Sequence, residues 1–299
     1  MTRHSFRCAA ESRRRDDQLA GTAPRAHGWV LIEHPGPWPF GGFAELPLPS
    51  EVVETVLHAA RRAGMRILLV RRHGRRRAAG ERAWAVLRYD AHGAHRQQWG
   101  TWSVATDLLR IAEAIGRPGS TGHPPVYLVC THGIHDACCA IRGRPVARAL
   151  AQEWPANTWD CSHVGGDRYA ANVVVVPDGV YFGAVTPQQA LDDVALLRRG
   201  LVSAEHLRGY CELPAPAQCA VAEVLRRLGP AGRHAIRLAG AESAGDRSSI
   251  VLSCEPPLPA RIQVEVRMFA LAEAQLTCRA PAPTRAVAYE TLSFEVQPD

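Results

Sequence analysis

Two short segments carry cysteines and histidines that are close enough in the sequence to bind a metal. The first, CTHGIHDACC, runs from Cys130 to Cys139, and the second contains Cys161 and His163 on either side of one residue. Thiolates and imidazoles hold iron–sulfur clusters, and a [2Fe–2S] cluster takes four protein donors. The same side chains hold structural zinc. The residue types therefore predict a metal or cluster site without choosing between iron–sulfur and zinc.

The remaining cysteines give no such pattern. The chain has nine cysteines, an odd number, and its N-terminus has no apolar core after its charges. We therefore expect neither a disulfide framework nor a secretory signal, and a cytoplasmic location. A thiol-redox enzyme is an alternative function, but such enzymes commonly use a CxxC pair, which this sequence lacks. The adjacent Cys138 and Cys139 are a strained substitute for it.

Around the cysteines, several motifs resemble the sucrase/ferredoxin-like family. They are CTHGxxDxCC, SHxGGxR(F/Y)AxN, VxxPDGVYxG and GTAPRAHGWVLIEHPGPW (21–38), and the resemblance extends over roughly residues 8–200. It implies a thioredoxin-like [2Fe–2S] ferredoxin domain, and hence an electron carrier instead of a catalyst. No paired carboxylates are placed for glycoside hydrolysis, so we expect no sucrase activity.

The resemblance also implies which residues bind the cluster. The family's two cysteines fall on Cys130 and Cys139, and its first histidine falls on His163. The second histidine of the family's HxxxH pattern is replaced here by Asp167. We predict Cys161 as the fourth ligand, because ferric iron–sulfide favours a thiolate, and Asp167 is the alternative. His132 and His135 flank the loop and are expected to be solvated, and the alternative is that they donate hydrogen bonds to the ligands of the cluster.

The elements that must position these residues follow an α/β rhythm. Apolar runs predict strands, and amphipathic stretches with capping and stop residues predict helices. The predicted strands are Gly28–Glu33, Met65–Val70, Ala83–Tyr89, Val126–Val129, Asn172–Val176 and Val180–Val185. The predicted helices are Glu51–Ala63, Ala105–Ile115, Arg144–Trp154, Pro187–Arg199 and Ala217–Leu228. Four further β-like runs are His234–Leu238, Ser249–Ser253, Arg261–Phe269 and Ala286–Phe294.

This order predicts thioredoxin-like α/β sandwich domains with a β-rich C-terminal extension. We expect an N-terminal α/β domain without a cluster (1–118), a [2Fe–2S] ferredoxin domain (124–202) and the extension (203–299). The GSTGHPP segment at 119–125 is the expected linker. No apolar run reaches the roughly 18 residues of a membrane-spanning helix.

The net charge of +6 raises the question of nucleic acid. All 35 basic residues are arginine, a bias that reflects a GC-rich coding sequence, and no nucleic-acid motif accompanies them. The densest cluster, Arg71, Arg72, Arg75, Arg76 and Arg77, is expected to be a solvated loop. A docking patch for an acidic redox partner is the alternative, because opposite charge speeds encounter.

Overall fold

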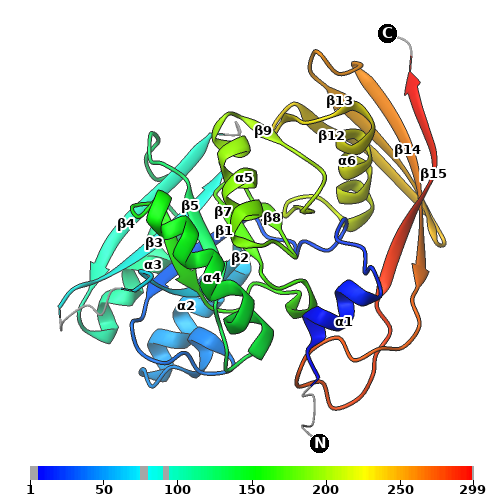
Figure 1. Ribbon diagram of the computed structural model, residues 1–299. Coiled ribbons are helices and arrows are strands. Elements are labelled where there is room, and N and C mark those ends of the chain that lie inside the picture. The colour runs from blue at the N-terminus through cyan, green and yellow to red at the C-terminus, as the bar shows by residue number, and fades with distance from the viewer. Residues whose placement is uncertain (1–5, 75–79, 90–93, 298–299) are drawn as a thin grey trace, which may run out of the picture. The chain divides into compact units, whose positions relative to one another are not determined.

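The computed structural model describes residues 6–74, 80–89 and 94–297, and the chain divides into two compact units. The sheet unit comprises Ala26–Gly165 and Ala171–Gly179. The C-terminal unit comprises Met1–Arg25, Gly166–Ala170 and Val180–Asp299. Both units contain helices and strands, so the expected α/β class is confirmed (Figure 1). None of the helices within the described residues is long and apolar enough to cross a membrane.

A large mixed sheet forms the sheet unit. Its strands lie in the order β7-β5-β6-β2-β1-β3-β4. They are β1 (Gly28–Glu33), β2 (Met65–Arg71), β3 (Arg82–Tyr89), β4 (His95–Trp102), β5 (Val126–Cys130), β6 (Thr158–Cys161) and β7 (Val173–Val176). The pairs β1–β2 and β5–β6 are parallel, and the pair β2–β6 is antiparallel. Strands from before and after the Gly119–Pro125 segment therefore belong to one sheet.

Continuous burial explains why most of these strands could be read from the sequence. Every residue of β1, β5 and β7 is buried. A strand covered on both faces reads as an unbroken apolar run. The strands β4 and β6 were not expected, because HRQQWGTW and TWDC carry polar residues and no such run.

Helices α2 (Ser50–Arg62), α3 (Leu109–Ile115) and α4 (Ala137–Glu153) complete the sheet unit, with the short helices η1 (Gly42–Glu45) and η2 (Ala105–Leu108). Helix α2 buries Val52, Val53, Val56 and Ala60 in a core cluster with residues of β1, β2 and β3. Apolar residues at this spacing form the buried face of an amphipathic helix. Helix α4 packs against β5 and β6.

The start of α4 differs from the expected helix, Arg144–Trp154. Helix α4 begins at Ala137, where the carboxylate of Asp136 accepts a hydrogen bond from the backbone N–H of Cys138 at 2.8 Å. Pro145 lies inside the helix, although proline is usually confined to the first turn. As a result, Cys139 is in the first helical turn.

The C-terminal unit contains the remaining helices and strands of the described residues. Its elements are α1 (Cys8–Arg14), η3 (Asp167–Tyr169), β8 (Val180–Phe182), α5 (Pro187–Arg198), β9 (Leu201–Val202), β10 (Leu207–Tyr210), α6 (Ala215–Leu228), β11 (Ala231–Gly232), β12 (Ile236–Ala244), β13 (Arg247–Cys254), β14 (Arg261–Ala270) and β15 (Val287–Gln297). The last four strands form an antiparallel sheet against which α6 packs. The expected β-rich tail is thus present. Helix α5 begins as predicted, with the Thr186 hydroxyl accepting from the N–H of Gln189 at 3.3 Å.

Candidate metal centre

Cys130 and Cys139 lie at the two ends of the loop that joins β5 to α4. Cys130 is the last residue of β5, and its side chain is 1% exposed. Cys139 is fully buried in the first turn of α4. The loop turns back on itself, since the N–H of Asp136 donates to the carbonyl of His132 at 3.1 Å. Strand end and helix start together bring the two thiols to one place.

The neighbouring strand supplies the second segment. Strand β6 runs parallel to β5, with Cys161 beside Cys130 in the register. The carboxyl ends of parallel neighbours lie at one edge of a sheet. His163 follows β6 by two residues and is half-buried. Its position beyond the end of the strand brings its imidazole to the same edge as Cys130.

Of the predicted ligands, Cys130, Cys139 and His163 come together. The ligand atoms of these three residues all lie within 4.8 Å of one another. Cys161 is not a member of this group, although it is the register partner of Cys130. Asp167, the alternative fourth ligand, belongs to the C-terminal unit. The structure thus assembles two thiols and one imidazole within the sheet unit.

The pKa values of Cys130 and Cys161, the last residues of β5 and β6, are shifted in opposite directions. Hydrogen bonding from the Cys139 thiol, together with His163 and the backbone N–H of His132, holds the pKa of Cys130 well below its usual value. Burial acts against this shift but does not reverse it. Burial, with the nearby Cys130 and Asp160, raises the pKa of Cys161 well above its usual value. These surroundings therefore favour the thiolate form at Cys130 and disfavour it at Cys161.

His135, which the sequence analysis placed in solvent, stacks on the site. Its ring lies 3.7 Å from that of His163, centroid to centroid, with 21° between the planes. Phe40 stacks on the other side of His135 at 4.5 Å and 20°. The Nδ1 atom of His135 lies 3.3 Å from the carbonyl oxygen of Phe40. The HPGPWP turn and the residues after it therefore fix the orientation of His135.

His132 is also packed and not solvated. It is 2% exposed, its Nε2 lies 3.3 Å from the carbonyl oxygen of Trp38, and its ring meets the Trp38 ring edge-on. The two carbonyl oxygens that meet His132 and His135 belong to Trp38 and Phe40, in and directly after the proline-rich segment at 34–39.

The arginine cluster is only partly described. The guanidinium of Arg71 lies over the ring of Trp38 at 4.2 Å, and that of Arg72 lies over Trp159 at 3.6 Å. Arg72 also donates to the carbonyl of Ala156 at 2.7 Å. These two side chains are packed instead of solvated, whereas the predictions for Arg75–Arg77 fall outside the described residues.

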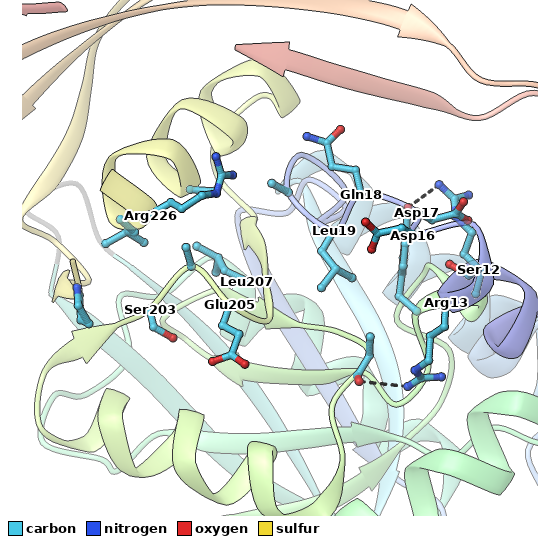
Figure 2. A pocket seen from close by; sticks show the side chains of 18 of the residues that line it. Ser12, Arg13, Asp16, Asp17, Gln18, Leu19, Ser203, Glu205, Leu207 and Arg226 are labelled. Carbon is cyan, nitrogen blue, oxygen red and sulfur yellow. Dashed lines mark hydrogen bonds and ion pairs between the residues drawn. The ribbon is translucent and has the colours of Figure 1, made fainter. Parts of the chain in front are cut away.

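A separate cavity of about 850 Å³ lies within the C-terminal unit. Figure 2 shows Asp16 and Leu19, which follow α1, on one side and Leu207 and Arg226 on the other. Asp17 at its border forms an ion pair with Arg168 at 3.2 Å, which ties the loop after α1 to η3. None of the four ligands predicted from the sequence lines this cavity. It is therefore distinct from the cysteine–histidine site.

Comparisons with known proteins bear on this site. A family model described as sucrase/ferredoxin-like matches residues 19–209. A stretch of 97 residues is 34% identical to altered inheritance of mitochondria protein 32 of Meyerozyma guilliermondii, covering 28% of this chain and 34% of that protein. The chain thus spans about a third of the length of this curated relative. No solved structure matches the chain. Since the family match contains Cys130, Cys139 and His163 and extends over more than half of the sequence, the chain belongs to the sucrase/ferredoxin-like family.

Proposed function

We propose that this protein transfers electrons through one [2Fe–2S] cluster held by Cys130, Cys139 and His163. The observation that carries the proposal is the convergence of these three donors, from β5, α4 and the segment after β6, within 4.8 Å. Family membership supports the same chemistry. When bound, such a cluster exchanges one electron between its ferric and ferrous states.

The residues present fit this group. Iron is held by thiolates, and the surroundings of Cys130 favour its thiolate form. The backbone N–H of His132 points at the Cys130 sulfur, which is how proteins tune cluster potentials. Neutral His163 in place of a thiolate lowers the negative charge at the site and raises the reduction potential. Because His163 is only half-buried, it is the donor through which the site would be reached from solvent.

The fourth donor expected from the sequence, Cys161, stays a prediction. So do the thioredoxin-like fold, the three-part division at 118–124 and 202–203, and the cytoplasmic location. The redox partner is unidentified, and a net charge of +6 would attract one with an acidic surface.

A structural zinc ion is the second candidate, and the compactness of the group favours it. Thiolates and imidazoles within 4.8 Å of one another also suit a single tetrahedral ion, with Zn–S near 2.3 Å and Zn–N near 2.1 Å. The donor set alone does not separate zinc from iron–sulfur. Metal analysis does.

Thiol-redox chemistry fits less well. The hydrogen bond between Cys139 and Cys130 resembles a nucleophile with its resolving thiol. However, Cys130 and Cys139 are 1% and 0% exposed, whereas reactive cysteines need access for their substrate. Burial therefore favours ligation over exchange.

The deciding experiment is anaerobic purification with iron, sulfide and zinc measured on one sample. About two irons and two sulfides per chain, with a rhombic EPR signal after dithionite reduction, are expected for the ferredoxin function. One zinc per chain and no colour would establish the structural-metal function instead. A colourless, metal-free protein after anaerobic reconstitution would contradict both.

A further inference from the structure

Three donors leave a [2Fe–2S] cluster one ligand short. Such a cluster needs four protein donors, and the group in the sheet unit supplies Cys130, Cys139 and His163. Within the sheet unit, the candidate for the fourth donor is a side chain that shares a second donor group with one of these three. Cys161 neighbours Cys130 in the strand register, but it belongs to none of the donor groups among the described residues.

His135 meets this condition. One of its ring nitrogens lies within 4.8 Å of a ring nitrogen of His163, and the two rings are stacked at 3.7 Å. It belongs to the loop between Cys130 and Cys139, so the chain that carries it already wraps the site. We propose, on the basis of the function proposed above, that His135 is the fourth cluster ligand and makes the site a Cys₂His₂ site.

The setting of His135 is that of a metal-binding histidine. Such histidines commonly donate one ring N–H to a carbonyl oxygen, which fixes the tautomer and directs the other nitrogen at the metal. The Nδ1 of His135 lies 3.3 Å from the carbonyl oxygen of Phe40. With the proton on Nδ1, the lone pair is on Nε2. The Phe40 ring, stacked at 4.5 Å, holds the imidazole plane parallel to that of His163.

His132 provides a contrast in the same loop. It makes a similar contact, from Nε2 to the carbonyl oxygen of Trp38 at 3.3 Å. Yet its ring is 5.6 Å from that of His135, and it belongs to none of the donor groups among the described residues. Its backbone N–H serves Cys130 instead. The loop thus separates a supporting histidine from a ligating one.

The test is to count the nitrogens bound to iron in the intact chain. Protein labelled with ¹⁵N-histidine is reduced with dithionite and studied by pulsed EPR. The wild type is expected to show two strongly coupled histidine nitrogens, and His135→Ala is expected to lose one of them or the cluster itself. His135→Cys, which keeps a donor at this position, should retain the cluster with one nitrogen and a lower reduction potential.

Cys161→Ser is the matched comparison and should retain both nitrogens. A wild type with one coupled nitrogen would overturn the assignment, whether Cys161 or Asp167 then supplies the fourth donor. So would a Cys161→Ser variant that loses the cluster while His135→Ala keeps it. Failure of the proposed function is a different result, because the wild type would then contain no iron or sulfide.

Discussion

Gly143 on α4 lies directly against the backbone of Cys130. A Cβ added at Gly143 would stand 2.1 Å from the carbonyl oxygen of Cys130. That oxygen belongs to the main chain of β5, so it cannot turn aside as a flexible side chain could. The close approach sets the distance between the helix that carries Cys139 and the strand that carries Cys130.

Gly143→Ala is therefore expected to destabilise the protein and to weaken metal binding. Replacing glycine by alanine in a helix interior normally stabilises the protein by about 1 kcal/mol. A loss of stability in Gly143→Ala would therefore be caused by the steric conflict with the Cys130 carbonyl. Overpacking of this kind costs roughly 1–3 kcal/mol. Urea unfolding gives the change in free energy, and iron content reports the site. In the control, Gly240→Ala, the new Cβ meets Val251 at an ordinary 3.9 Å, and equal losses in both variants would refute the argument.

Serine in place of Cys130 or Cys139 should abolish the cluster, because a hydroxyl is a poor ligand for ferric iron–sulfide. Visible absorption and iron content after anaerobic purification measure the loss. Cys219→Ser is the matched control, since Cys219 is a buried thiol in α6 of the C-terminal unit and lies in none of the donor groups of the described residues. Unchanged spectra in both site variants would contradict the ligand assignment.

The cap of α4 links helix stability to the site. Asp136→Ala should cost about 1 kcal/mol, because the N–H of Cys138 loses its acceptor. Asp136→Asn should recover most of it. Thr186→Ala at the N-cap of α5 removes a comparable cap and should have a comparable cost. Iron release during mild heating distinguishes the two variants. Asp136→Ala is expected to release iron at a lower temperature than Thr186→Ala, because Cys139 lies in the helical turn that Asp136 caps.

A pH dependence is expected from the C-terminal unit. The Nδ1 of His206 lies 2.8 Å from the carboxylate of Asp193, and this hydrogen bond raises the pKa of His206 above 6.5. Burial raises the pKa of Asp193, and the hydrogen bond to His206 offsets only part of this shift. The pair therefore stabilises the charged form of His206 more than the charged form of Asp193. Because the folded pKa of His206 exceeds the unfolded one, its contribution is complete below 6.5 and is lost as the pH rises through the folded pKa.

Asp193→Asn should therefore return the pKa of His206 towards 6.5 and remove this part of the pH dependence. Titration of the His206 ring by NMR measures the first effect, and urea unfolding on either side of that pH measures the second. His123→Ala, on the 119–125 segment of the sheet unit, should leave both unchanged. A His206 pKa that is the same with and without the Asp193 carboxylate would disprove the coupling.

Much of the fold was readable because apolar burial leaves a direct mark on the sequence. The runs that became β1, β5 and β7 are buried throughout, and β2 and β3 are buried over about half of their length. Helix α2 shows its core stripe at helical spacing. Strands that are defined by pairing with neighbouring strands, and not by an apolar run, were not predicted. Strand β6 is only four residues long and is defined by pairing with β5 and β2.

The sequence by itself determined the donor types, the two segments that carry them and the family. It did not decide which donors meet. Cys161 was preferred as the fourth ligand because ferric iron–sulfide favours a thiolate, and that argument concerns the type of donor and not its position. Strand β6 ends at Cys161, so His163 lies beyond the strand and its position depends on the segment that follows.

Only the tertiary structure separated Cys161 from Cys130, Cys139 and His163 and stacked His135 on His163. The physical reason is that these contacts depend on where a strand ends, where a cap starts a helix, and which carbonyl of a distant turn meets a ring nitrogen.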